Sequence, residues 1–124
     1  MPNSIFIADD HPFIIEGMGQ LISEGIEFEI VGHSNNGIDA ISEIKVLQPD
    51  CAIIDLSMPG ANGLEVFLEC KKWTPDTKFI VITGQPITAI FSKLIDAGIN
   101  GIFLKNTPQL KLQKAFEMCF RASK

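Results

Sequence analysis

The chain has 124 residues, 46% of them hydrophobic, and its 10 Lys and Arg against 15 Asp and Glu give a formal net charge of −5. That length and apolar content suit a single domain over residues 1–124. No basic run interleaves with aromatic residues, so direct DNA or RNA binding is not expected. No apolar stretch reaches the roughly 18 residues of a membrane helix, and the N-terminus lacks a signal-peptide pattern. A soluble, cytoplasmic protein is expected.

Isolated residues that can carry chemistry have simpler structural explanations. Cys51, Cys70 and Cys119 lie in apolar segments without the paired spacing of a zinc or redox site, so they are interpreted as reduced core residues. His33 falls in an expected strand and is interpreted as structural. Trp73 is expected to pack or to form part of a half-exposed apolar patch.

Short β-branched runs alternate five times with segments of helical period, which predicts successive βα units around a parallel sheet. The expected strands are 5–8, 29–33, 51–54, 79–82 and 101–104. Each intervening segment and the last one carry an apolar stripe, interpreted as core that covers the sheet. These stripes are Ile14, Met18, Leu21 and Ile22; Ile41, Ile44 and Leu47; Leu64, Phe67 and Leu68; Ile90, Phe91, Leu94 and Ile95; and Leu112, Ala115, Phe116, Cys119 and Phe120.

Residues that begin and end helices fall between these runs. The expected first-turn prolines are Pro12 and Pro108, the expected N-caps are Asn36, Asn62 and Thr107, and the expected left-handed helix end is Gly98. Right-handed crossovers place helices on both faces of a doubly wound sheet, with the ligand crevice at the carboxyl ends of the strands.

Candidate site residues follow four of the five expected strands, at the edge where a crevice is expected. They are Asp9 and Asp10, then Asp55, then Thr83 with Gly84, and finally Lys105. Three carboxylates at one edge would repel each other unless a cation compensates them. An oxygen-only donor set without Cys or His favours Mg²⁺, with Mn²⁺ as the alternative, over zinc.

A carboxylate beside such a metal can act as a nucleophile toward a phosphoryl group and form an aspartyl phosphate. Asp55, after the central strand, is the best placed of the three. The transferred group spreads negative charge over its oxygens, and Lys105 and Thr83 with the Gly84 amide provide the complementary cation and donors.

Nearly the whole chain resembles a response-regulator receiver domain of two-component signalling, nearest to receivers of LuxR/NarL-type transcription factors. The motifs that carry this resemblance are Ala8-Asp9-Asp10-His11-Pro12, the stretch 53–63 around Asp55, Ile82-Thr83-Gly84 and Gly101-Ile102-Phe103-Leu104-Lys105. The resemblance implies a CheY-like, flavodoxin-like α/β fold with five parallel strands in the order 2-1-3-4-5 and five helices.

The same resemblance implies a metal site. Asp10 and Asp55 would bind Mg²⁺ directly together with the carbonyl of Ser57, and Asp9 would assist through water. Asp55 would be phosphorylated by a sensor histidine kinase or a phosphotransfer protein, and Thr83 and Lys105 would contact the phosphate.

The expected output is a conformational switch that controls transcription through a DNA-binding domain absent from this chain, with a possible phosphorylation-dependent homodimer. A chain that stops at Lys124 is either an excised domain or a stand-alone receiver. Two residues depart from the common family pattern. Asn106 stands where many receivers have proline, and Ile102 stands where many have an aromatic switch residue.

One alternative function stays open, and two others fit the residues poorly. A pseudo-receiver would keep the fold and act by protein binding alone. A haloacid-dehalogenase-like phosphatase would need a second acidic residue where Ser57 stands. A flavodoxin-like electron carrier would need a phosphate-binding loop where Asp9 and Asp10 stand, and these carboxylates would repel a phosphate.

Overall fold

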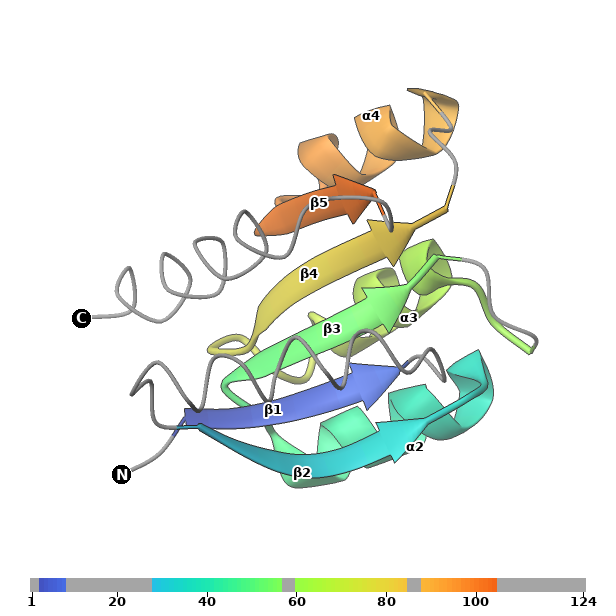
Figure 1. Ribbon diagram of the computed structural model, residues 1–124. Helices are drawn as coiled ribbons and strands as arrows, with labels where there is room; N and C mark the ends of the chain where they lie inside the picture. Colours follow the sequence, from blue (N-terminus) through green and yellow to red (C-terminus); the bar gives the residue numbers. More distant parts are fainter. Residues whose placement is uncertain (1–2, 9–27, 57–59, 85–87, 105–124) are drawn as a thin grey trace.

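The computed structural model describes residues 3–8, 28–56, 60–84 and 88–104. It contains a five-stranded parallel sheet in the order β2-β1-β3-β4-β5, which confirms the expected topology (Figure 1). The strands are β1 Asn3–Ala8, β2 Phe28–Ser34, β3 Cys51–Asp55, β4 Lys78–Thr83 and β5 Gly101–Leu104. The helices in the described part of the chain are α2 Gly37–Leu47, α3 Gly63–Cys70 and α4 Thr88–Asp96.

The expected first and fifth helices fall outside the described residues, and so do Pro12, Thr107 and Pro108. Helices α2 and α3 pack against each other on one side of the sheet, where α2 contacts β1 and β2 and α3 contacts β3 (Figure 1). None of the helices within the described ranges has the length and apolar character of a membrane span.

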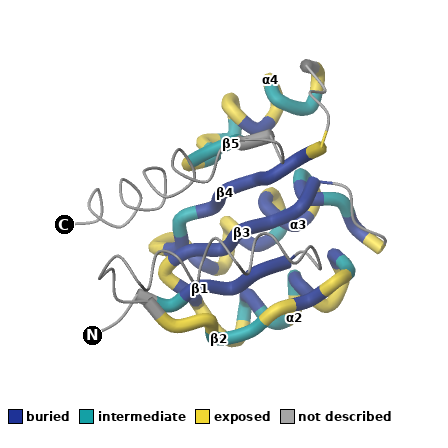
Figure 2. The backbone as a smooth tube through the Cα atoms, viewed as in Figure 1, coloured by how far each residue is buried: buried dark blue, intermediate teal, exposed yellow. Residues whose placement is uncertain are grey.

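The central strands of the sheet, β3 and β4, are shielded from solvent. Every residue of β3 is buried, and so are residues 79–83 of β4, as Figure 2 shows for both strands. Their unbroken apolar sequences fit strands that are covered on both faces. Phe6, Ile44 and Ile54 belong to the same buried cluster, together with an edge-to-face pair between Phe67 and Phe79 whose ring centroids are 5.1 Å apart.

The prediction that the apolar stripes of the helices are buried is wrong for some of their residues. Ile44, Phe67 and Leu94 are buried as predicted, but three stripe residues are substantially exposed. These are Leu47 at 40%, Leu68 at 39% and Ile95 at 65%. Leu68 and Ile95 each follow a buried residue directly, and a step of about 100° around the helix turns the next side chain away from the sheet. Leu47 is the last residue of α2 and lies close to Gly32 of β2.

The expected helix boundaries within the described ranges are confirmed. The Asn36 side chain accepts a hydrogen bond from the Asp39 amide at the start of α2. Asn62 forms a capping box at the start of α3, because its side chain accepts from the Glu65 amide while Glu65 accepts from the Asn62 amide. Gly98, after α4, has a φ of 87°, a left-handed conformation that favours glycine.

Candidate functional site

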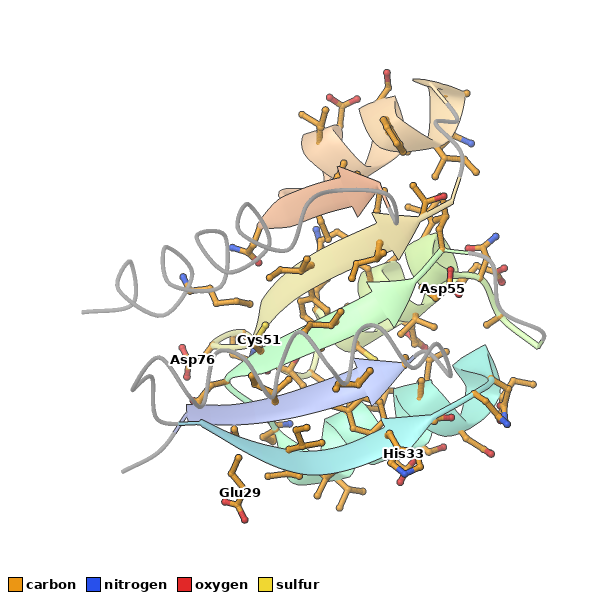
Figure 3. The ribbon with its side chains drawn as sticks, in the orientation of Figure 1. Glu29, His33, Cys51, Asp55 and Asp76 are labelled. Carbon is orange, nitrogen blue, oxygen red and sulfur yellow. The ribbon has the colours of Figure 1, made fainter. Side chains whose placement is uncertain are left out.

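The carboxyl ends of all five strands meet at one edge of the sheet, and Asp55 lies there (Figure 3). Asp55 is the last residue of β3 and Thr83 is the last residue of β4, so both belong to the strands rather than following them as expected. Asp55 pairs in register with Ile82, and the ladder continues one step further where the Leu56 amide donates to the Ile82 carbonyl at 2.9 Å. Thr83 therefore ends β4 one register step beyond the partner of Asp55.

Both residues are withdrawn from solvent. The exposed fraction is 4% for Asp55 and 1% for Thr83. A carboxylate in such a position depends on hydrogen-bond donors or on a cation for the solvation it has lost. Gly84, which follows Thr83, is exposed at the same edge. The edge thus combines a buried carboxylate, a buried hydroxyl and an accessible backbone.

The loop after β3 is held close to the strand that carries Asp55. Gly60 has a φ of 86°, which explains why glycine stands there. The Gly63 amide donates to the Leu56 carbonyl at 3.0 Å. A Cβ at Gly63 would lie 2.8 Å from the Leu56 Cα and 2.9 Å from the Asp55 carbonyl oxygen, so only glycine permits this approach. Gly60 therefore serves the turn, and Gly63 serves the close approach of the loop to the end of β3.

Several predicted site residues lie outside the described residues. These are Asp9, Asp10, Ser57 and Lys105. The described strands end directly before two of them, because β1 ends at Ala8 and β5 ends at Leu104. Within the described ranges, no three His, Cys, Asp or Glu side chains gather into a group that could hold a metal. Two of the three carboxylates proposed for the metal fall outside those ranges, so the three-carboxylate site stays a prediction.

The described cysteines lie away from this edge. Cys51 and Cys70 are buried and reduced, in agreement with their interpretation as core residues, while Cys119 falls outside the described residues. Burial raises the pKa of the Cys70 thiol to about 11, against a smaller opposing effect of Lys45. Cys70 is therefore a neutral thiol near pH 7, unsuited to act as a nucleophile or a metal ligand.

Trp73 also lies far from Asp55 along the sheet. It follows α3 and precedes β4, so it is near the amino ends of the strands, whereas Asp55 is at a carboxyl end. Its side chain is 60% exposed, and the Lys45 Nζ lies 5.3 Å from its ring centroid. These observations fit the expected half-exposed apolar position. His33 is exposed on β2, the outermost strand beside β1.

One contact near the site was not anticipated from the sequence. Gly37, the first residue of α2, touches the backbone of Ala61 in the loop after β3. A glycine directly after the Asn36 cap, where alanine would favour the helix, is the sequence signal that could have pointed to a close approach.

The parallel strand order, with Asp55 and Thr83 buried at its carboxyl edge, defines a CheY-like α/β domain. The chain belongs to the Response regulator receiver domain family, which matches residues 5–117. Members of this family are generally signalling modules rather than conventional enzymes. The similar proteins include response regulators of the NarL and DesR type and of the LuxR family.

Two relatives illustrate the similarity in sequence. The transcriptional regulatory protein DesR of Bacillus subtilis is 38% identical over 114 residues, which cover 90% of this chain and 55% of DesR. The nitrate/nitrite response regulator protein NarL of Escherichia coli is 32% identical over 114 residues, which cover 92% of this chain and 53% of NarL. The chain thus spans about half the length of these relatives.

Two solved structures show the similarity in fold. The isolated receiver domain of RcsB from Salmonella enterica, solved with the phosphomimetic BeF3⁻, has a TM-score of 0.84 and 29% identity, and the match covers 100% of this chain and 92% of that one. The receiver domain of NarL from Mycobacterium tuberculosis has a TM-score of 0.82 and 28% identity, with 97% of both chains covered.

Proposed function

We propose that this domain accepts a phosphoryl group on Asp55 and uses it to switch an output. The observation that carries the proposal is the position of Asp55, buried at the carboxyl end of the central strand β3, one register step from Thr83 on β4. Membership of the receiver family supports the same chemistry. So does the use of a phosphomimetic with the similar receiver domain of RcsB.

The proposed transfer is a displacement at phosphorus. A carboxylate oxygen of Asp55 forms a bond to the phosphorus while the bond from phosphorus to the donor's histidine nitrogen breaks. The electron pair of the broken bond leaves with the imidazole ring, which takes up a proton. The Thr83 hydroxyl would donate a hydrogen bond to a phosphoryl oxygen, and Lys105 would compensate the added negative charge. The Gly84 amide is a further donor at the same edge.

The proposed metal is Mg²⁺, with Mn²⁺ as an alternative, held by Asp9, Asp10, Asp55 and the Ser57 carbonyl. The donor set fits, because oxygen ligands are what these cations prefer. The strand register supports this grouping. Ala8 on β1 pairs with Ile54 on β3, and the residues that follow these two in the sequence are Asp9 and Asp55. When bound, the metal would offset the repulsion between carboxylates and phosphoryl oxygens.

The proposed donor is a sensor histidine kinase or a phosphotransfer protein. Relatives such as DesR are named as transcriptional regulatory proteins, and a LuxR-family relative from Staphylococcus aureus is named as a DNA-binding response regulator. This chain covers 55% of DesR, so we propose that transcription is controlled through a DNA-binding domain outside the chain. Phosphorylation would act by favouring a homodimer of the receiver.

Intact-mass measurement tests the proposal. After incubation with acetyl phosphate and Mg²⁺, the wild-type domain should gain the mass of one phosphoryl group, and Asp55→Asn should gain none. The adduct should be lost in mild base, because acyl phosphates hydrolyse readily. A phosphoryl group that persists on Asp55→Asn would show that another residue is modified. An unmodified wild type would favour a receiver that acts by binding alone.

A further inference from the structure

The start of α2 and the loop after β3 are in direct backbone contact. Gly37 is buried, and a Cβ built on it would overlap the carbonyl oxygen of Ala61. The same Cβ would lie 2.6 Å from the Ala61 carbonyl carbon and 2.7 Å from its Cβ. Side-chain carbons do not approach other atoms this closely, so any larger residue at this position must displace either the loop or the first turn of α2.

The backbone conformation of Gly37 does not explain the glycine. Among the described residues, the glycines with positive φ are Gly60 and Gly98, and Gly37 is a helical residue of α2. Alanine is also a better helix former than glycine. Helix propensity therefore favours alanine at position 37. The close contact with Ala61, which leaves no room for a Cβ, is the feature that requires glycine there.

The loop that Gly37 touches continues directly to the strand of Asp55. Two residues after Ala61, Gly63 donates its amide to the Leu56 carbonyl at 3.0 Å and faces the Asp55 carbonyl. On the other side of Ala61, Gly60 faces Ile38 of α2, whose Cγ1 lies 3.2 Å from the Cβ position of that glycine. The loop is thus held between the first turn of α2 and the end of β3.

We propose that Gly37 is a positioning residue for the phosphoryl and metal site. By allowing α2 to meet the loop backbone, it holds residues 60–63 against the end of β3 that carries Asp55. The inference rests on the proposed function, in which the Ser57 carbonyl in that stretch binds Mg²⁺. Displacing the loop would move a metal ligand while leaving the side chains of Asp55 and Thr83 in place.

Gly37→Ala tests the inference, with Gly98→Ala as its matched control. Both variants replace glycine by alanine, but Gly98 has no heavy atom within 4 Å of its Cβ position, so alanine there is strained only by its φ of 87°. Calorimetric titration with Mg²⁺, well below the melting temperature, should show a dissociation constant raised roughly tenfold in Gly37→Ala, the usual scale for residues that orient metal ligands. Gly98→Ala should lose stability and keep the wild-type constant.

Phosphorylation kinetics add a readout that a purely structural role would not move. The Mg²⁺ concentration for half-maximal phosphorylation by acetyl phosphate should rise in Gly37→Ala. The rate at saturating Mg²⁺ should change much less, because Asp55 and Thr83 are untouched. A dissociation constant for Mg²⁺ equal to the wild-type value would overturn the inference, whatever the melting temperature. So would an equal rise in Gly98→Ala.

A second variant covers the case in which Gly37→Ala does not fold. Ile38 is 61% exposed and faces Gly60, so Ile38→Ala removes support from the loop without opening the core. It should weaken Mg²⁺ binding severalfold, whereas Val46→Ala, at an 81% exposed position on the same helix, should not. Unchanged binding in Ile38→Ala would overturn the inference. A wild-type domain that neither binds Mg²⁺ nor is phosphorylated would overturn the proposed function itself.

Discussion

Asp55 and Thr83 end neighbouring parallel strands one register step apart, and both are almost fully buried. Asp55 ends β3 opposite Ile82, and Thr83 is the next residue of β4. A hydroxyl donor and a carboxylate are thereby brought to the same edge by two segments that are far apart in the sequence.

Activation should move the loop after β4 more than the side chain of Ile102. A phosphate on Asp55 adds strong acceptor oxygens, to which the Thr83 hydroxyl can donate a hydrogen bond. Forming this hydrogen bond draws the end of β4 inward. Ile102 is partly buried against the core and is stiff at its first torsion, so it has little freedom to exchange rotamers. With Mg²⁺ and beryllofluoride, amide NMR shifts should be largest for residues 84–88 and for α4.

Thr83→Ala is the control for this prediction. Without the hydroxyl, beryllofluoride should bind with a much smaller effect on residues 84–88. Large shifts confined to Ile102 and β5 would contradict the loop-driven switch. An unchanged response in Thr83→Ala would remove the hydroxyl from the mechanism.

Mg²⁺ should raise the melting temperature of the domain by mass action. At a metal concentration of 100 times the dissociation constant, the gain is about 2.7 kcal/mol. Asp10→Ala should abolish the response, because it removes a proposed direct ligand. The apo form of that variant should be at least as stable as the wild type, since one of three crowded carboxylates is gone. Differential scanning calorimetry with and without Mg²⁺ measures both effects, and a wild-type Mg²⁺ response in Asp10→Ala would show that Asp10 is not a ligand.

The capping box at the start of α3 should contribute measurably to stability. Asn62→Ala removes the hydrogen bond of 2.9 Å from the Glu65 amide and should lower the free energy of unfolding by about 1 kcal/mol. Asn35→Ala, at an exposed position, should change it by less than about 0.5 kcal/mol. Urea unfolding of the two variants and the wild type makes the comparison. Equal effects would mean that the cap adds nothing.

Cys70 should make stability fall at alkaline pH. Burial raises the pKa of its thiol from 9.0 to about 11 in the folded protein, so folding favours the protonated form. That contribution is complete below about pH 9 and is lost as the pH rises through about 11. The stability advantage of the wild type over Cys70→Ala should therefore shrink across this window in urea titrations. A difference that stays constant with pH would contradict the burial effect.

The sequence by itself determined the architecture and the edge where the chemistry is proposed. Unbroken apolar runs predict buried parallel strands, and the structure has β3 and β4 in that state. The Asn36 and Asn62 caps were also predictable, because the hydrogen bond between a cap side chain and the start of its own helix is a local interaction. Asp55 was predictable because the carboxyl end of a strand can be found from the strand alone.

Only the tertiary structure decided which helix positions are covered and which glycines are needed. Leu68 and Ile95 are apolar and at helical spacing, yet their exposure depends on how far neighbouring elements extend over each helix. The contact between Gly37 and Ala61 depends on how closely α2 packs beside the loop after β3. Sequence patterns report local propensity and periodicity, whereas a contact between distant segments follows from packing that no local pattern encodes.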